Sequence, residues 1–348
     1  MLRSIFTAFF FLCGVSSAAV DLVYRLPTKN DALFRNKHKD FYTYVDRTFE
    51  GITSQPWEAG TYGFVRNPFR LKDGRVMFSR MHEGIDISPV SRDKNGEPQD
   101  IVHPVAPGRV VYTNEQPGLS NYGRYIVVAH SVPEGQFYTV YAHLAEVRCT
   151  VGQHVGTGNE LGKLGYSGDG INKTRAHLHL EICFLINQHY DKFSPPENKH
   201  GIYNGQNLIG FDISALLIHC KNGEPLSISK HLSTLQEHYR VRVPCIGTMD
   251  LLQRYPFLYK GNWGSRPAAL DMVFTAEGVP LAVYPAGDKV TEPTIIRCIP
   301  KPTLQQNCTA NRVKNSSTNA KLTASGLKFI NNFLWLEGKY PPVQTEGE

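Results

Sequence analysis

The sequence predicts an all-β domain built from antiparallel hairpins, followed by a C-terminal α+β extension. Short runs rich in β-branched and aromatic residues recur from residue 61 to about residue 185, and Gly, Pro, Asn or Ser bounds each run, as is typical of strands. The 348 residues include 30 Gly and 22 Pro, a composition that favours strands and turns over long helices. With 41% hydrophobic residues, the chain can bury a substantial core.

Strands of the β domain are predicted at residues 109–113, 125–129 and 137–141, with turns between them. Residues 20–60 are polar and aromatic, and we expect them to form a lead-in segment packed on this domain. Residues 187–210 are polar and contain two adjacent prolines, so we interpret them as a surface insertion. The predicted domain therefore covers residues 61–219.

The extension, residues 220–348, mixes helix and hairpin signals. Just before it, Asp212 is placed to cap a short helix that ends near His219, and a second helix is predicted at residues 229–239. Residues 271–275 and 279–284 flank an Ala-Glu-Gly turn and predict a hairpin. From residue 323, apolar residues at helical spacing predict a terminal helix. The extension has no motif of reactive chemistry, and the sequence assigns it no role.

The first 19 residues predict export. Arg3 precedes a largely apolar run at residues 5–15, and small residues follow it, which is the pattern of a secretory signal cleaved after Ala18 or Ala19. The alternative is a retained anchor, although the run is short for a membrane-spanning helix. No later stretch is long and apolar enough to cross a membrane, so we expect a periplasmic or secreted protein without a membrane span.

Cysteine usage and charge fit an exported protein. Removing the signal removes Cys13 and leaves six cysteines, an even number that suggests disulfides with 15 possible pairings. The pairs we favour are Cys298–Cys308, Cys220–Cys245 and Cys149–Cys183. The net charge of +6 is mild, and no run rich in Lys and Arg indicates a nucleic-acid partner.

Two histidines share one face of a predicted strand. In residues 176–184, apolar residues alternate with His177, His179 and Glu181. Because residues two apart on a strand lie roughly 6.5 Å apart on the same face, both imidazoles can serve one site. Taken alone, the pair could equally be two solvated histidines on an outer face. Glu181 on the same face is a reserve candidate for orienting a neighbouring group.

Three more residues extend this set. His82 and Asp86 lie in a loop that runs into a strand, where an imidazole and a carboxylate can converge on one cation; a helix cap or an ion pair with Arg80 is the alternative. His143 follows the predicted strand at 137–141, and its alternative is a strand-end histidine bonded to the backbone. Imidazole nitrogens and a carboxylate oxygen are the usual ligands of catalytic zinc, and three of them leave a position open for water. Five such side chains therefore provide a zinc site with two histidines for proton transfer.

The phrases around these residues resemble one known family. They are His-Glu-Gly-Ile-Asp-Ile at 82–87, Val-Ala-Pro-Gly-Arg-Val at 105–110, Asn-Tyr-Gly at 121–123, Tyr-Ala-His-Leu at 141–144, Gly-Tyr-Ser-Gly at 165–168 and His-Leu-His-Leu-Glu at 177–181. In this order they resemble the lysostaphin-type (LytM-like) zinc endopeptidases, over about residues 60–185. The resemblance implies an all-β catalytic domain with a LytM-like groove.

The same resemblance implies a role for each residue. His82, Asp86 and His179 match the family's ligands of one Zn²⁺ ion, and His143 and His177 match its two catalytic histidines. His130 falls where members often carry a histidine that is not a ligand. The implied activity is hydrolysis of peptide cross-links or bridges in bacterial peptidoglycan, which makes peptidoglycan the expected partner.

Three details depart from the family pattern. Arg175 and Ala176 stand where a Gly-Pro-like pair is common, and residues 91–100 look inserted. The tyrosine that glycine-cleaving members place shortly before the first histidine is missing, which favours a D-alanine to diamino-acid cross-link over a glycine bridge. Two alternatives remain: a non-catalytic relative that activates wall amidases, and a secreted zinc peptidase or toxin with other targets.

Overall fold

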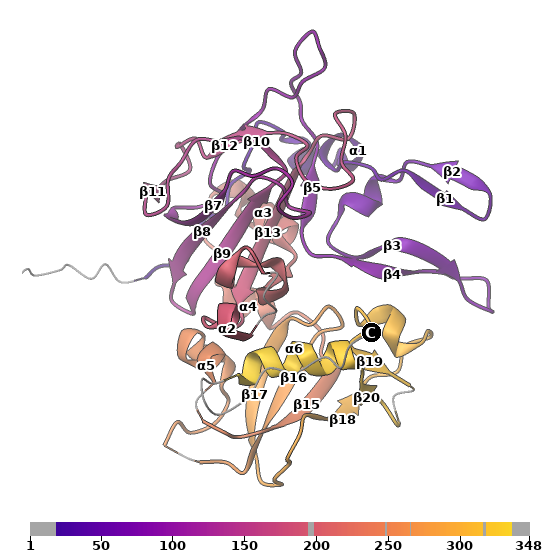
Figure 1. The fold of residues 1–348 in the computed structure, drawn as a ribbon, viewed down its shortest axis with the longest axis vertical. Helices are drawn as coiled ribbons and strands as arrows, with labels where there is room; N and C mark the ends of the chain where they lie inside the picture. Colours follow the sequence, from indigo (N-terminus) through magenta and orange to yellow (C-terminus); the bar gives the residue numbers. More distant parts are fainter. Residues whose placement is uncertain (1–18, 194–197, 248, 265, 316–317, 336–348) are drawn as a thin grey trace, which may run out of the picture.

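The computed structural model describes residues 19–193, 198–247, 249–264, 266–315 and 318–335. In Figure 1 a large sheet formed by the first part of the chain lies above a smaller sheet formed by the C-terminal part, and two hairpins project to one side. Apart from Ala19, the predicted signal at residues 1–19 lies outside the described residues.

A seven-stranded antiparallel sheet forms the centre of the molecule. Its strand order is β11-β7-β8-β9-β13-β14, and β5 pairs with β13. Successive side chains of β8 and β9 point to opposite faces of the sheet. Aromatic and β-branched residues on both faces are buried. The strands are β5 (Ile85–Ile87), β7 (Gly108–Asn114), β8 (Tyr125–Val132), β9 (Gly135–Ala142), β11 (His154–Val155), β13 (Leu178–Leu185) and β14 (Leu208–Phe211).

Smaller β elements surround one end of this sheet. One hairpin consists of β1 (Arg47–Phe49) and β2 (Ile52–Ser54), and a longer one of β3 (Gly63–Arg70) and β4 (Val76–His82). A three-stranded sheet has the order β10 (Leu144–Val147), β12 (Gly162–Leu164), β6 (Ile101–Val102). The two hairpins are the projecting ribbons of Figure 1.

The lead-in segment packs on the central sheet. It contains the short helices η1 (Ala32–Arg35) and α1 (His38–Phe41), and Phe41 is fully buried. Beyond α1, the Thr43 amide donates to the Asp86 carbonyl at 2.9 Å and the Ser88 amide donates to the Phe41 carbonyl at 2.8 Å. The lead-in thus braces the outer edge of β5.

The interpretation of residues 187–210 as a surface insertion is wrong for its last part. Leu208–Phe211 is β14, a fully buried strand of the central sheet, and α2 (Tyr190–Phe193), η3 (Gly201–Tyr203) and η4 (Gly205–Asn207) precede it. The surrounding polar residues obscure this four-residue apolar run in the sequence. Residues 198–207 cover one face of the sheet, where the hydroxyl of Tyr112 lies 2.8 Å from Nδ1 of His200.

The C-terminal part forms a second antiparallel sheet with helices. The sheet order is β17 (Pro280–Ala286), β16 (Ala269–Phe274), β15 (Tyr239–Pro244), β18 (Thr294–Cys298), and β19 (Val313–Lys314) pairs with β20 (Lys321–Leu322). The predicted hairpin is β16–β17 and the predicted terminal helix is α6 (Ala324–Leu334). The remaining helices are α3 (Ile213–His219), η5 (Cys220–Asn222), α4 (Ile228–Leu232), α5 (Asp250–Arg254), η6 (Pro256–Leu258), η7 (Gln305–Cys308) and, in the first part of the chain, η2 (Trp57–Gly60).

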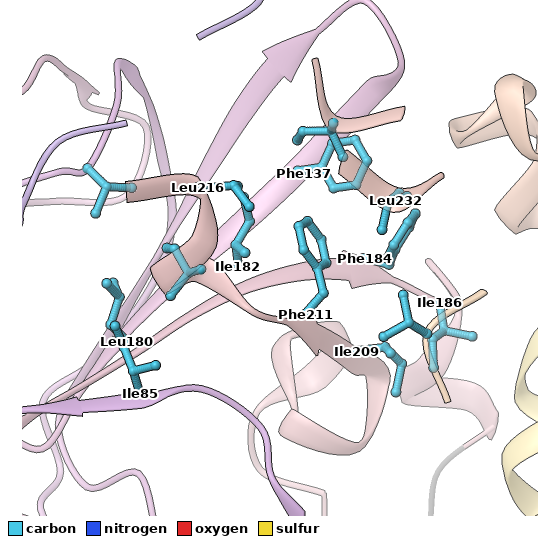
Figure 2. Packing of buried hydrophobic residues seen from close by; sticks show 14 of the residues in the cluster. Ile85, Phe137, Leu180, Ile182, Phe184, Ile186, Ile209, Phe211, Leu216 and Leu232 are labelled. Carbon is cyan, nitrogen blue, oxygen red and sulfur yellow. The ribbon is translucent and has the colours of Figure 1, made fainter. Parts of the chain in front are cut away.

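One continuous core joins the two parts. Figure 2 shows Ile182 and Phe184 of β13 facing Phe211 of β14, with Leu216 of α3 beside them. Beyond α5, the ring of Tyr255 lies 4.8 Å from that of Phe184. The same tyrosine donates its hydroxyl hydrogen to the Gln136 carbonyl at 2.7 Å and accepts the Leu185 amide at 3.0 Å. The extension therefore completes the core of the central sheet.

The structure confirms the predicted fold class, an all-β domain of antiparallel sheets with an α+β extension. The predicted N-cap is present, since Asp212 accepts the Ser214 amide at 2.9 Å. The second helix is shorter than predicted: α4 ends at Leu232, and β15 begins at Tyr239, the last residue of the predicted helix.

The favoured disulfides are wrong, because all six cysteines that the structure describes are free thiols. Cys149 packs in the main core on one side of the central sheet, whereas Cys183 packs in the cluster on the opposite face. Cys298 and Cys308 are buried, and burial raises the pKa of both thiols.

Candidate metal centre

Antiparallel pairing brings two of the predicted ligands face to face. Asp86 in β5 is the direct register partner of His179 in β13. His82 ends β4, and a tight turn at Gly84 leads the chain into β5. A Cβ atom at Gly84 would lie 2.3 Å from the Leu180 carbonyl oxygen, so only glycine lets this turn approach β13. The turn thereby brings His82 to the two paired residues.

One atom from each of the three side chains meets at a common point. Nε2 of His82 lies 3.1 Å from Oδ1 of Asp86 and 3.2 Å from Nδ1 of His179, and the last two atoms are 2.9 Å apart. All three residues are buried. Tetrahedral zinc with bonds of about 2.0–2.2 Å places neighbouring ligand atoms roughly 3.3–3.6 Å apart. A small outward shift of the three side chains would therefore accommodate the ion.

The hydrogen bonds behind these imidazoles determine which ring nitrogens face the common point. Nδ1 of His82 lies 2.8 Å from the Thr61 carbonyl oxygen, and Nε2 of His179 lies 2.7 Å from Oε1 of Glu181. Both oxygens only accept, so these outer nitrogens carry the ring hydrogens. In the neutral imidazoles the inner nitrogens then present lone pairs to each other and to the carboxylate of Asp86. Three acceptors at this distance fit a metal ion, and the outer partners fix the ring orientations.

The second carboxylate oxygen of Asp86 is held by Arg66. Nη2 of Arg66 on β3 donates to Oδ2 of Asp86 at 2.6 Å, and its Nε donates to the Ala59 carbonyl at 3.0 Å. The ion pair with Arg80 considered as an alternative is therefore replaced by one with Arg66. This contact leaves Oδ1 alone facing the centre. No sequence signal identifies Arg66, because it lies on a separate hairpin from Asp86.

The two remaining histidines flank these three residues. His143 follows β9 with φ of 63°, a left-handed conformation that non-glycine residues seldom adopt. Its amide donates to the Tyr122 carbonyl at 2.9 Å and its Nδ1 lies 3.0 Å from the Ser167 carbonyl oxygen. His177 precedes β13, with Nδ1 2.7 Å from the Arg175 carbonyl oxygen and Nε2 3.4 Å from Oδ1 of Asp86. Both rings thus direct Nε2 away from these carbonyls.

The ring centroids of His143 and His177 are 4.8 Å apart, so all five predicted residues converge. Burial lowers the pKa of His143 well below its ordinary value, and the neighbouring imidazoles lower it further. Burial also lowers the pKa of His177, against the opposing effect of Asp86. The lowered pKa of each ring favours its neutral form.

The three inner atoms lie in a field that favours positive charge. Burial alone would lower the pKa of His179, but the carboxylates of Asp86 and Glu181 raise it to about 10. Burial alone would likewise raise the pKa of Asp86, but the imidazoles around it, His82 first, hold it well below its ordinary value. A metal cation bound at the common point would replace the positive charge that a protonated imidazole supplies there.

Glu181 supports the centre from behind. It is fully buried, and its Oε1 accepts from Nε2 of His179 and, at 2.5 Å, from the hydroxyl of Tyr122. Sequence analysis placed Glu181 on the correct strand face but did not find Tyr122. Tyr122 belongs to the motif Asn-Tyr-Gly. The next residue, Gly123, packs against Ser167 and so holds the loop of Tyr122 close to the centre.

His130 lies apart from the three converging residues. Its Nδ1 is 2.8 Å from the Pro107 carbonyl oxygen and its Nε2 is 2.7 Å from the Thr139 hydroxyl. It is fully buried, and burial lowers its pKa to about 4.

The centre opens into a groove of about 830 Å³. The four histidines and Asp86 line its base. Its walls come from residues 45–49 and from the β3–β4 hairpin, with residues 121–122 and 169–175 completing the rim. A peptide segment can therefore reach the five residues from solvent.

Comparison with known proteins identifies the domain that holds this site. Residues 80–192 match the model of Peptidase family M23, and this range contains all five residues. Residues 80–192 are therefore similar to Peptidase family M23, in agreement with the lysostaphin-type (LytM-like) motifs of the sequence.

Two curated relatives share this part of the chain. The "Outer membrane antigenic lipoprotein B" of Haemophilus influenzae is 31% identical over 128 residues, which cover 37% of this chain and 26% of the relative. The protein of the same name from Histophilus somni is 28% identical over 141 residues, which cover 40% of this chain and 35% of the relative. The match thus spans about a third or less of the length of these relatives.

Among solved structures, the catalytic domain of the antimicrobial peptidase lysostaphin from Staphylococcus simulans is 25% identical, with a TM-score of 0.25 over 35% of this chain and 75% of that domain.

Within the described residues, no helix has the length and apolarity needed to span a bilayer.

Proposed function

We propose that this chain is an exported zinc-dependent endopeptidase that hydrolyses peptide cross-links of bacterial peptidoglycan. The observation that carries the proposal is the convergence of His82, Asp86 and His179, whose inner atoms face one another while their outer nitrogens are already hydrogen-bonded. Two neutral histidines beside them and an open groove add the requirements of a hydrolase. Export rests on the signal-like segment and on relatives that are named outer membrane lipoproteins.

The residues divide the chemical work between holding the metal and moving a proton. A bound zinc ion would lower the pKa of a water molecule toward about 7 and polarise the scissile carbonyl. His82, Asp86 and His179 would hold that ion. His143 and His177 act jointly: with Nδ1 of each committed to a backbone carbonyl, Nε2 can take the water proton, return it to the leaving amine or donate to the developing oxyanion. Such proton transfer is typically worth about 10²–10⁴-fold in rate.

The first test removes a ligand. His179→Ala should lose stoichiometric zinc, measured by elemental analysis of the purified mature chain, and should release no fragments from wall material by mass spectrometry. His154→Ala is the matched control, because His154 is exposed on β11 and should keep both properties. Full hydrolysis by His179→Ala would refute the ligand assignment.

The second test separates catalysis from metal binding. His143→Ala should keep zinc and lose turnover, whereas loss of zinc would move His143 into the ligand set. A non-catalytic activator of wall amidases would release no fragments even in the wild type. A peptidase with other targets would prefer protein substrates to intact wall, so cleavage of both materials is measured side by side.

A further inference from the structure

Arg175 lies on the wall of the groove with most of its donors unused. The residue is half-buried, and its Nε donates to the Tyr44 carbonyl at 3.4 Å. Among the residues that the structure describes, neither terminal nitrogen of Arg175 has a hydrogen-bond acceptor, and no carboxylate lies within 4.0 Å of them. Arg66 in the same groove is different, since its charge is paired with Asp86. A half-buried arginine without an anionic partner is a place where an anionic ligand gains binding energy.

The backbone of Arg175 is fixed relative to the reaction centre. Its carbonyl oxygen accepts from Nδ1 of His177 at 2.7 Å, and its amide donates to Oδ1 of Asn172 at 3.0 Å. Arg92 ties the preceding loop by donating to the carbonyls of Lys173 at 2.9 Å and Thr174 at 3.3 Å. The side chain therefore projects from a braced loop two residues from a proposed catalytic histidine.

The other charged groups of the groove do not duplicate this position. Arg47 donates to the Val65 carbonyl at 2.8 Å and lies over the ring of Phe78 at 5.0 Å, so part of its donor set is used. Arg80 is exposed to solvent.

The acidic side chains of the groove do not neutralise Arg175 either. Asp46 accepts from Gln55 at 2.9 Å, and neither Glu83 nor Asp169 forms an ion pair with Arg175 among the described residues. The local charge of Arg175 is thus available to a bound molecule.

We propose that Arg175 forms a carboxylate-binding subsite, which selects peptides carrying a free carboxylate close to the bond that is cut. This inference rests on the proposed function, because it assigns a substrate feature to the same groove. The planar guanidinium of Arg175 can bind a carboxylate through two parallel N–H···O hydrogen bonds. A carboxamide, which is uncharged and has one acceptor oxygen, cannot form this pair of bonds. Arg175 is a specificity residue, and its contribution should appear mainly in KM.

The test uses soluble cross-linked peptides released from one wall preparation and divided into two batches. One batch keeps its free carboxylates, and the other has them converted to carboxamides. The wild type should show a KM about tenfold to a hundredfold lower for the carboxylate batch, as expected for a charge-assisted bidentate contact. Arg175→Gln should lose most of this preference, measured as the ratio of the KM values for the two batches. Arg175→Lys should keep part of it, because the charge remains and the planar guanidinium is lost.

Arg80→Gln makes the same charge change elsewhere in the groove. It should keep the preference, and an equal loss in Arg80→Gln would show a general field instead of a subsite and overturn the proposal. Retention of the preference in Arg175→Gln would overturn it as well.

Binding distinguishes failure of this inference from failure of the proposed function. Dye-labelled peptides of both batches are titrated by fluorescence anisotropy into zinc-loaded His143→Ala protein, with and without Arg175→Gln. Binding that prefers carboxylates through Arg175, without any turnover by the wild type, would leave the subsite standing and refute the peptidase. Turnover of both batches at equal KM would refute the subsite and leave the peptidase. Absence of both binding and turnover would refute both.

Discussion

Replacing Glu181 by Gln should weaken zinc binding by about tenfold without unfolding the protein. Glu181 accepts from Nε2 of His179 at 2.7 Å, so that Nδ1 is the ring nitrogen left facing the metal position. Gln preserves the shape and an acceptor oxygen but removes the charge. Charge-assisted hydrogen bonds contribute about 1.5–3 kcal/mol and neutral ones about 0.5–1.5 kcal/mol. The difference of about 1–1.5 kcal/mol corresponds to roughly a 5- to 13-fold change in Kd.

Removing the acceptor altogether should cost more. Glu181→Ala leaves His179 free to rotate and to change tautomer, and loss of such an outer partner typically costs about 10–100-fold in metal affinity. Zinc Kd values are obtained by competition with a chromophoric chelator. Thermal unfolding in excess chelator is followed in parallel, so that a loss of fold is not mistaken for a loss of affinity.

Cys183→Ala is the matched control for both Glu181 variants. Cys183 is buried beside Glu181, and its thiol donates to Oε2 at 3.1 Å, the oxygen that does not contact His179. This variant should bind zinc within about twofold of the wild type, since the bond to His179 is untouched. If Glu181→Gln and Cys183→Ala had the same Kd as the wild type, the proposed orienting role of Glu181 would be wrong.

Three further predictions concern the scaffold. Asp212→Ala removes the cap of α3 and should lower the free energy of unfolding in urea by about 1 kcal/mol, with Asp212→Asn recovering most of the loss. Gly84→Ala would place a Cβ atom 2.3 Å from the Leu180 carbonyl oxygen, so the free energy of unfolding should fall by about 1–3 kcal/mol and zinc should be held less tightly; an unchanged Kd would contradict the described packing. Burial lowers the pKa of His130 to about 4, below the value of about 6.5 in an unfolded chain, so the unfolded state binds more protons between these values. Its contribution to stability is full above pH 6.5 and falls by about 2 kcal/mol at pH 5, and the stability difference between the wild type and His130→Gln should shrink by that amount between pH 8 and pH 5.

Local signals explain what the sequence predicts well. The alternation around His177 and His179 follows from strand geometry, and the cap at Asp212 needs only its own amide neighbours. The hairpin of β16 and β17 likewise depends on a short turn between two apolar runs. These features are determined within a few residues, so a single sequence carries them.

The features that the sequence does not predict depend on distant parts of the chain. Arg66 reaches Asp86 across a hairpin, and Tyr122 reaches Glu181 across 59 positions. The free thiol of Cys183 depends on which face of the sheet its strand presents. No local pattern encodes these contacts, because tertiary packing alone brings the partners together.

The outer acceptors of the four histidines explain why residue identity matters at some supporting positions and not at others. Three of the acceptors are backbone carbonyls, those of Thr61, Ser167 and Arg175, which any side chain at these positions would still provide. The fourth is the carboxylate of Glu181, which only an acidic residue supplies. Substitution at 175 can therefore change what the groove binds while His177 keeps its orientation. That independence makes Arg175→Gln a test of recognition, and Glu181→Gln a test of the metal centre itself.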